Sequence, residues 1–312
     1  MDKYLFGPVP SRRLGISLGL DIIPYKTCTL DCLYCECGKT NNHSLVRKSF
    51  FPPEKLLSET DIFLKKKIHL DYITFAGSGE PTLNSDIGYM IKKLKRITNT
   101  PIAVLTNGTL LDRPKVREDL LLSDLLLPSL DAVSEDVFKK INNPVEGITA
   151  KQLVKGLIDF SKIYKGKIWV EVFISKGIND SVEELGRIRK VLEQIDPARI
   201  QLNSLDRPPA YTEAKTAGHK LLTSIMDSWK DLPVEIIKRV KTRDEIPSFS
   251  KNLENSIMNT IVRRPLTLED LITLTGKNRL ELNKYIDILE KEKTIRTEIV
   301  GEKIFFRPYS ET

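Results

Sequence analysis

All four cysteines of the chain lie in one short stretch, the cysteine loop of residues 24–37. Cys28, Cys32 and Cys35 form a Cys-x3-Cys-x2-Cys triplet, and Cys37 follows after one intervening residue. Thiols packed this densely in a chain with no sign of secretion favour a metal centre over disulfides. A 4Fe–4S cube normally takes four cysteine ligands. Three ligands would leave one iron with an open coordination position, which a chemically active metal site needs.

The triplet resembles the signature of the radical S-adenosylmethionine (SAM) superfamily, Cys-x3-Cys-x-aromatic-Cys, with Tyr34 in the aromatic slot. The resemblance implies that Cys28, Cys32 and Cys35 bind the cluster and that SAM binds the open iron through its amino and carboxylate groups. It also implies that one electron cleaves SAM to methionine and a 5′-deoxyadenosyl radical, which removes a hydrogen atom from a substrate. Tyr34 is then expected to help position SAM.

A closed site, with zinc or an iron–sulfur centre bound by all four thiolates, is the alternative. Only one residue separates Cys35 from Cys37, and His43 is the only imidazole nearby. Zinc ligands usually come as paired knuckles, which this spacing does not provide. The pattern therefore favours the open cluster, and we expect Cys37 to be a small buried hydrophobic residue.

Hydrophobic periodicity alternates between strands and helices over the first two thirds of the chain. The expected strands span residues 15–23, 72–76, 102–106, 124–130, 167–174 and 199–203. The first expected helix begins near residue 51, and the others span residues 86–96, 135–141, 151–163, 182–195 and 215–229. This alternation predicts an α/β fold with a parallel sheet. Six β/α units fit a partial TIM-type (β/α)6 barrel, as the resemblance implies.

The remainder of the chain has a different pattern. Residues 241–250 are charged and polar, which indicates a linker. Beyond it we expect helices over 252–263, from 267 and over 277–291, then a hairpin over 295–306. Three helices and a hairpin resemble a winged helix-turn-helix. The predicted domains are thus a barrel over 1–240, a linker over 241–250 and a winged-helix-like domain over 251–312.

A glycine-rich turn follows the second expected strand. Residues 77–81, Gly77-Ser78-Gly79-Glu80-Pro81, resemble the Gly-Gly-Glu-Pro motif of the superfamily, which holds the amino group of SAM through backbone carbonyls. Ser78 departs from the glycine of that motif, so the contact requires that serine adopt the same backbone conformation. An ordinary tight turn is the alternative, since glycine-rich turns are common.

Polar residues also end the next strands, and the active site of a β/α barrel occupies this carboxyl face. Thr106 and Asn107 end the third strand, Ser129 and Asp131 the fourth, and Asn203 the sixth. The resemblance implies contacts with the methionine, ribose or adenine parts of SAM, or in the case of Asn203 with the substrate. The alternatives are an Asn-Gly turn at Asn107, a helix cap at Asp131 and a solvated strand end at Asn203.

Two arginines precede the first expected strand. Arg12 and Arg13 could clamp a carboxylate or phosphate bidentately, although a surface pair is the simpler interpretation. Together with the cysteine loop, residues 7–15, 77–83 and 203–209 resemble a subgroup of radical SAM proteins related to the tRNA wyosine-base synthases. Because every cysteine lies in one loop, no second cluster can be bound by cysteine elsewhere.

Composition limits the remaining choices only weakly. A net charge of +7 is compatible with a polyanionic partner but does not require one. The C-terminal residues 251–312 carry eleven Lys and Arg against ten Asp and Glu, a net charge of about +1, and nucleic-acid footprints are usually more one-sided. The N-terminus has no signal-peptide pattern, and the apolar run at 120–127 is too short to span a bilayer. We therefore expect a cytoplasmic protein without a membrane partner.

These observations predict a radical SAM enzyme with a 4Fe–4S cluster and SAM as cofactors, and with a flavodoxin or ferredoxin as electron donor. Its substrate could be RNA, such as a tRNA base, or a protein, and a small metabolite is the further option. We favour a macromolecule, because an added winged helix is surplus for a metabolite. The competing class is a regulator, an iron–sulfur redox sensor that drives a DNA-binding winged helix. That class does not explain six β/α units with polar strand ends.

Overall fold

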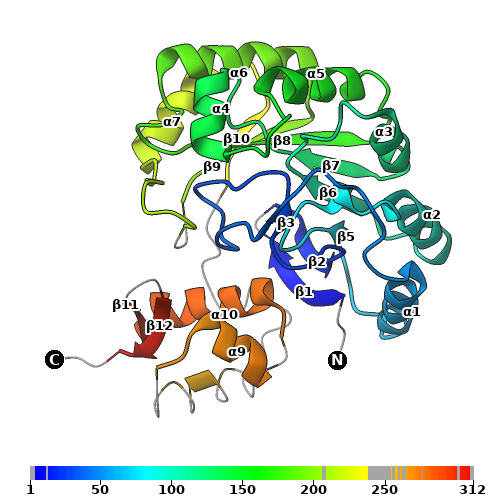
Figure 1. Cartoon of the computed structure of the whole chain (residues 1–312), viewed down its shortest axis with the longest axis vertical. Coiled ribbons are helices and arrows are strands. Elements are labelled where there is room, and N and C mark those ends of the chain that lie inside the picture. The colour runs from blue at the N-terminus through cyan, green and yellow to red at the C-terminus, as the bar shows by residue number, and fades with distance from the viewer. Residues whose placement is uncertain are drawn as a thin grey trace.

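The structure is a computed structural model that describes residues 4–11, 13–205, 209–237, 254, 257–258, 261, 265–275, 277–300 and 303–309. Its main feature is an eight-stranded sheet in the order β1-β2-β5-β6-β7-β8-β9-β10, with helices around it (Figure 1). Every neighbouring pair from β2 to β10 is parallel, and β1 is antiparallel to β2. The strands are β1 (Leu5–Ser11), β2 (Gly15–Leu20), β5 (Tyr72–Phe75), β6 (Ile102–Thr106), β7 (Leu125–Pro128), β8 (Lys167–Phe173), β9 (Arg199–Asn203) and β10 (Val234–Ile236).

The helices of this part connect successive parallel strands, as the alternating pattern predicts. They are α1 (Pro53–Leu64), the 3₁₀ turn η1 (Pro81–Leu83), α2 (Ile87–Ile97), α3 (Pro114–Leu120), α4 (Glu135–Asn142), α5 (Ala150–Ser161), α6 (Val182–Ile195) and α7 (His219–Ser228). The predicted α/β fold, a partial TIM-type barrel, is confirmed. The six predicted strands correspond to β2 and β5 to β9.

Two strands and one helix lie outside the predicted pattern. β1 contains Pro8 and Pro10, and its register with β2 shifts between Phe6 and Val9. Proline cannot donate to a ladder, so it is tolerated on such an edge strand, where it also hides the strand from a pattern search. β10 has three residues and α3 has seven, too few for a clear period.

Capping residues fix two of the helices next to the site. Thr149 and Gln152 form a reciprocal capping box at the start of α5. The hydroxyl of Ser181 accepts from the amide of Glu184 in the first turn of α6. The Glu184 carboxylate in turn accepts from the amides of Val133 (2.6 Å) and Ser134 (2.9 Å). The start of α6 therefore holds the loop that follows β7.

Alternation along the strands gives the sheet two different faces. Val104, Leu126 and Val170 belong to the large core that the helices cover. The residues between them face the concave side, where Ala103, Leu125, Leu127 and Trp169 pack together with Leu14. The segment between β1 and β2 therefore crosses the inside of the barrel, where it can reach the site.

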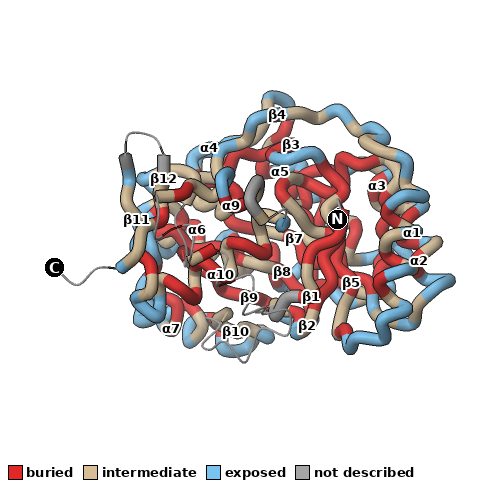
Figure 2. The backbone as a smooth tube through the Cα atoms, turned by 90° about the horizontal axis from the view of Figure 1, so that it is seen from below, coloured by how far each residue is buried: buried red, intermediate tan, exposed pale blue. Residues whose placement is uncertain are grey.

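The C-terminal part has its own hydrophobic core. It contains α9 (Leu268–Thr275), α10 (Arg279–Lys291) and an antiparallel hairpin of β11 (Ile295–Val300) and β12 (Lys303–Pro308), seen at lower left in Figure 1. Leu271, Leu282, Tyr285 and Leu289 are buried within it. Figure 2 shows this buried interior, with α10 buried or partly buried over almost its whole length. We call these elements the C-terminal module.

The predicted linker at 241–250 and most of the predicted helix at 252–263 lie outside the described residues. The division of the chain at that linker and the winged-helix topology therefore stay predictions. None of the helices in the described part of the chain is both long enough and apolar enough to cross a membrane.

Candidate functional site

The cysteine loop follows β2 at the carboxyl edge of the sheet. It begins with β3 (Thr27–Cys28), which pairs in parallel with β4 (Asn42–His43). Two tight turns follow, in which the amide of Cys35 donates to the carbonyl of Cys32 and that of Gly38 to the carbonyl of Cys35, both at 3.1 Å. His43 is exposed, and its Nε2 lies 3.1 Å from the Thr29 carbonyl. The loop is thus held by its own backbone.

The thiols of the triplet differ from that of Cys37. Cys28, Cys32 and Cys35 are partly exposed, whereas Cys37 is 7% exposed and packs in the core. Each triplet sulfur also has a nitrogen donor from a side chain. The donors are Asn107 Nδ2 to Cys28 Sγ (3.5 Å), Asn142 Nδ2 to Cys32 Sγ (3.4 Å) and Lys26 Nζ to Cys35 Sγ (3.1 Å). Three partly exposed sulfurs with N–H donors suit a bound iron–sulfur centre, because hydrogen bonds to the sulfurs tune its reduction potential.

The surroundings of the three thiols give them different pKa values. Burial raises the pKa of Cys28 to about 12 and that of Cys32 well above its usual value. A hydrogen bond from the Cys37 thiol, assisted by the Lys26 ammonium, lowers the pKa of Cys35 to about 6. The lowered pKa of Cys35 favours its thiolate, the form that binds metal.

The donor set also distinguishes between kinds of metal centre. Among the described residues, no three His, Cys, Asp or Glu side chains could hold a single metal ion. A zinc site needs its ligands to meet at one ion, which these thiols do not do here. In a 4Fe–4S cube each thiolate binds a different iron, so the sulfurs stay apart. Three cysteine thiols are the donor set that a cube with one open iron would take.

The glycine-rich turn between β5 and η1 touches the cysteine loop and the strand end before it. A Cβ at Gly77 would lie 2.1 Å from Asp21 Oδ1, and one at Gly79 would lie 2.1 Å from the Thr27 carbonyl oxygen. At Gly79 the neighbour is backbone, so only glycine allows that approach, whereas a side chain at position 77 would have to displace the Asp21 carboxylate. Ser78 has no positive φ, and its hydroxyl donates to Asp21 Oδ2 at 2.9 Å. Serine therefore replaces glycine here without left-handed backbone.

Replacing Gly79 with alanine is expected to displace the cysteine loop, because the new methyl group meets backbone rather than a flexible side chain. We expect a loss of about 1–3 kcal/mol in the free energy of unfolding and a lower iron content after cluster assembly. Gly186→Ala is the matched control, since a Cβ there meets nothing within 4 Å in helix α6. Equal denaturation midpoints and iron contents for the two variants would contradict the close approach.

Glu80 is a buried hydrogen-bond acceptor that connects two βα loops. Its Oε1 accepts from the Thr82 amide (3.0 Å), the Thr82 hydroxyl (2.6 Å) and the Thr106 hydroxyl (2.6 Å), and its Oε2 from the Asn107 amide (2.7 Å). Burial raises the pKa of Glu80. The Asn107 side chain donates to Thr29 Oγ1 at 2.8 Å, so Glu80 positions a residue that touches the cysteine loop.

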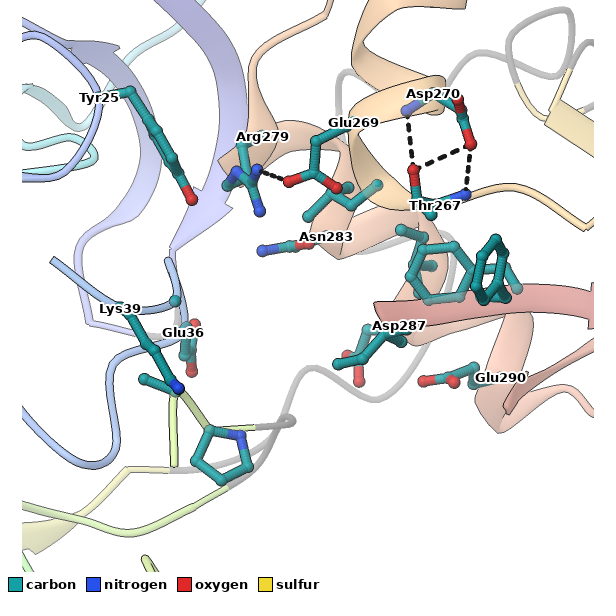
Figure 3. Close-up of a pocket in the computed structure, with 18 residues that line it drawn as sticks. Tyr25, Glu36, Lys39, Thr267, Glu269, Asp270, Arg279, Asn283, Asp287 and Glu290 are labelled. Atoms are coloured by element: carbon teal, nitrogen blue, oxygen red, sulfur yellow. Dashed lines mark hydrogen bonds and ion pairs between the residues drawn. The ribbon is translucent and has the colours of Figure 1, made fainter. Parts of the chain in front are cut away.

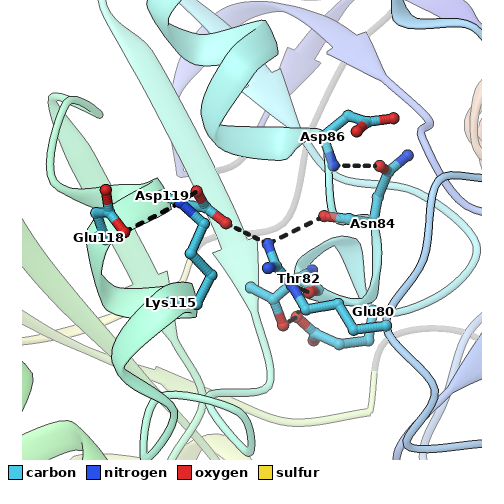
Figure 4. A network of polar contacts seen from close by, with 8 residues as sticks. Glu80, Thr82, Asn84, Asp86, Lys115, Glu118 and Asp119 are labelled. Carbon is cyan, nitrogen blue, oxygen red and sulfur yellow. Dashed lines mark hydrogen bonds and ion pairs between the residues drawn. The ribbon is translucent and has the colours of Figure 1, made fainter.

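A second network extends outward from this point (Figure 4). Arg47, which follows β4, donates to the carbonyls of Thr82 (2.9 Å) and Asn84 (3.3 Å) and forms an ion pair with Asp119 of α3. Asn84 also donates to the carbonyl of Ile22 at 2.9 Å. The chain on both sides of the cysteine loop is thereby attached to the turn that carries Glu80.

Tyr34 joins the cysteine loop to the other half of the barrel. Its ring stacks on Phe173 with centroids 3.8 Å apart and an interplanar angle of 11°, and its hydroxyl donates to Asp131. Asp131 also accepts from Asn142 Nδ2 (2.8 Å) and the Phe173 amide (3.0 Å) and is 2% exposed. Burial raises the pKa of this carboxyl to about 6. The ends of β7 and β8 therefore hold the aromatic residue between Cys32 and Cys35.

A polar cluster lies across β7, β8 and β9 on the concave face. Ser129 forms a backbone bridge with Glu171, and Asn203 Nδ2 donates to Glu171 Oε1 at 2.7 Å. The second oxygen of Glu171 accepts from Arg13 Nη1 at 2.6 Å. Arg13 therefore forms an ion pair inside the barrel. Arg12 lies outside the described residues.

Comparison with known sequences assigns this arrangement to a family. The sequence model of the radical SAM superfamily matches residues 22–188, more than half of the chain. The chain belongs to the radical SAM superfamily. The cofactors of that superfamily are a 4Fe–4S cluster and SAM, as predicted, and the matched region holds the whole cysteine loop.

Relatives match over nearly the whole chain. A UPF0026 protein of Methanocaldococcus jannaschii is 31% identical over 307 residues, covering 96% of this chain and 94% of its own length. One from Synechocystis is 35% identical over 255 residues, covering 81% and 93%. This radical SAM chain therefore belongs with the UPF0026 proteins. A protein of Brachyspira hyodysenteriae named GTPase Obg is 36% identical over 96% of this chain, which spans 44% of that protein's length.

Solved structures agree on the fold. The structure of TYW1 with a lysine–pyruvate adduct has a TM-score of 0.53 at 18% identity and covers 72% of this chain and 76% of its own. Streptococcus suis SuiB bound to SAM has a TM-score of 0.55 at 17% identity, with coverages of 76% and 54%. At these identities the likeness concerns the radical SAM barrel alone.

The residues predicted to contact SAM gather at the carboxyl edge of this radical SAM barrel. They are Tyr34, Gly77, Ser78, Gly79, Glu80, Thr106, Asn107, Ser129, Asp131 and Asn203. The carboxylates of Glu80 and Asp131 already accept the hydrogen bonds described above, which join neighbouring loops. The hydroxyl of Ser129 makes no hydrogen bond within the described part of the chain. Contact of these residues with SAM stays a prediction.

Some residues of the site carry no local sequence signal. Asn142 lies 110 positions from Cys32, and Glu171 lies 158 positions from Arg13. Lys26 is closer to its partner Cys35 and has a positive φ of 53°, which turns the chain at the start of the loop. Only its position beside the triplet could have indicated its role.

The C-terminal module lies against the outside of the cysteine loop. A cavity of about 700 Å³ separates them, with Tyr25, Glu36 and Lys39 on one side and the module on the other (Figure 3). The Arg279 guanidinium lies 4.5 Å from the centroid of the Tyr25 ring, and the Tyr25 hydroxyl donates to the Cys37 carbonyl at 2.5 Å. The module is thereby connected to the loop that carries the triplet.

Proposed function

We propose that this chain is a radical SAM enzyme in which Cys28, Cys32 and Cys35 hold a 4Fe–4S cluster with one iron left open. The observation that carries the proposal is the contrast between three reachable, hydrogen-bonded thiols and a buried Cys37. When bound, the cluster supplies the electron that splits SAM into methionine and a 5′-deoxyadenosyl radical. The protein supplies orientation and protection from side reactions.

The chain's own residues bind and orient SAM in this proposal. The backbone of the turn at residues 77–80 receives the SAM amino group, and the buried Glu80 keeps that turn in place. The Ser129 hydroxyl is available for the ribose, whereas Asp131 acts through Tyr34, which it holds by a hydrogen bond. Asn107 acts on the cysteine loop by donating to Cys28 and Thr29.

The concave face of the sheet receives the substrate. The layer toward the amino ends of the strands is apolar, with Leu125, Leu127 and Trp169 packed against Leu14. This layer closes that end of the barrel to water. Water exclusion protects a reactive intermediate from side reactions. Hydrogen abstraction is then confined to the polar end of the barrel, beside the cysteine loop.

Anaerobic assembly of the cluster, followed by dithionite and SAM, tests the enzyme class. We expect 5′-deoxyadenosine and methionine to form in equal amounts and only in the presence of the reductant. A flavodoxin or ferredoxin is expected to replace dithionite as electron donor. The competing sensor class predicts a reduced cluster with no 5′-deoxyadenosine, and that result would overturn the proposal.

The cavity beside the cysteine loop bears on the substrate. Among the residues that the structure describes, five acidic side chains line it against two basic ones, Lys39 and Arg279. A phosphate backbone would meet net repulsion there. We therefore infer that RNA does not run through this cavity, and a protein substrate is the macromolecule that it favours. The acidic residues are Glu36, Glu269, Asp270, Asp287 and Glu290.

This inference also assigns a role to the C-terminal residues. The barrel over 1–240 performs the reaction, and the domain over 251–312, joined through 241–250, contacts a macromolecule or covers the cysteine loop. The stacking of Arg279 on Tyr25 supports the second role. The near-neutral charge of residues 251–312 gives no support to DNA binding.

A further inference from the structure

A chain of side-chain contacts on the concave face holds neither the cysteine loop nor the turn at residues 77–80. It runs from Arg13 through Glu171 to Asn203, with bonds of 2.6 Å and 2.7 Å. Glu171 lies between Trp169 and Phe173 on the same face of β8, and Phe173 stacks on Tyr34 of the cysteine loop. The polar chain therefore lies next to the cysteine loop, inside the barrel.

Arg13 uses only part of its hydrogen-bonding capacity there. A guanidinium group is a planar fork of several N–H donors that matches the oxygens of a carboxylate or phosphate. Arg13 gives one bond to Glu171 through Nη1, and its Nε and Nη2 make no hydrogen bond to the described part of the chain. The side chain is 20% exposed and that of Glu171 is 14% exposed. Unused donors thus remain within reach of a ligand.

Stability alone does not account for this ion pair. The residues below it on the same face are apolar and pack well. Replacing a buried ion pair by apolar residues is often neutral or stabilising, because two charges must be desolvated. The ion pair is also not needed to hold its two segments together. Arg13 and Glu171 are 158 positions apart, but Leu14, the neighbour of Arg13, already packs against the same face of the sheet. A ligand charge is the simplest use of the arginine.

We propose that Arg13 binds an anionic oxygen group of the substrate, a carboxylate or a phosphate, inside the barrel, and that Glu171 is the internal counterion that holds Arg13 until the substrate arrives. Asn203 keeps Glu171 in position by donating to its other oxygen. The inference rests on the proposed function, because it assigns the concave face to the substrate. It makes the substrate an anion and fixes one end of it relative to the cysteine loop.

The proposal gives opposite effects for the two charged residues. The carboxylate of Glu171 repels an incoming anion, so Glu171→Gln should strengthen anion binding. Loss of Arg13 should abolish it. Arg13→Met alone would leave the largely buried Glu171 without its cation. The loss of the arginine is therefore tested in the double variant Arg13→Met/Glu171→Gln, which carries neither charge.

The experiment measures the melting temperature of the cluster-loaded full chain in chloride, acetate and inorganic phosphate at equal ionic strength. We expect acetate or phosphate to raise the melting temperature of the wild type over chloride by about 2–4 °C. The increase should be larger in Glu171→Gln and absent in the double variant. The more stabilising anion identifies the group as carboxylate or phosphate.

Several results would overturn the proposal. Equal anion effects in wild type and double variant would mean that the anion binds elsewhere, and no effect in any form would mean that Arg13 has no anion site. A parallel loss of SAM affinity in the double variant would assign Arg13 to the carboxylate of SAM. Failure of SAM cleavage with an intact anion effect would refute the proposed function instead, so the two failures can be told apart.

Discussion

Cys32→Ala is expected to abolish cluster assembly. The triplet supplies three ligands, and no other partly exposed thiol can replace one, since every cysteine lies in the loop and Cys37 is buried. Anaerobic reconstitution of the wild type should give about four iron atoms per chain and the broad absorption of an iron–sulfur cluster. The variant should give neither, and it should form no 5′-deoxyadenosine.

Cys37→Ala is the matched control. Its thiol is 7% exposed and meets Cys35 rather than a reachable surface, so its removal deletes a small packed side chain and no ligand. We expect full iron content and retained SAM cleavage. Loss of the cluster in this variant would mean four protein ligands and no open iron, and the enzyme class would fall with it.

The part of the site that the sequence predicts is the part that is local in sequence. Cys28, Cys32 and Cys35 lie within one loop, and their spacing carries the chemistry without any knowledge of the fold. The six strands were also predictable, because a buried parallel strand is a short apolar run between turn residues. Ser78 is an instructive case, since its departure from glycine needs only an ordinary φ and a hydroxyl partner, Asp21.

The contacts that adjust the site join distant residues and leave no pattern. Asn142 lies at the end of α4, a helix that its apolar face predicts, yet its side-chain amide donates to Cys32 and Asp131. Glu171 sits in a strand whose alternation predicts only which face it occupies. Whether a polar residue on that face meets Arg13, solvent or a ligand depends on how the barrel closes, which no single segment determines.

Of the substitutions outside the triplet, Glu80→Ala is expected to have the largest effect on stability and on SAM binding. It would leave four donors without their acceptor, namely the amide and hydroxyl of Thr82, the hydroxyl of Thr106 and the amide of Asn107. Each buried donor without a partner costs about 1–3 kcal/mol. Because the four share one network, we expect a combined loss of about 4 kcal/mol in the free energy of unfolding, measured by chemical denaturation.

The effect on function should exceed the effect on cluster content. Asn107 is held by Glu80 and donates to Cys28 and Thr29, but the cysteine ligands themselves remain in Glu80→Ala. We therefore expect cluster assembly at reduced yield and a much larger decrease in SAM affinity, because the turn at residues 77–80 loses its anchor. Glu54→Ala is the control, since Glu54 is exposed and its one hydrogen bond among the described residues comes from the exposed Tyr89 hydroxyl at 3.2 Å. If Glu80→Ala bound SAM as tightly as Glu54→Ala, the turn would not be the SAM-binding element.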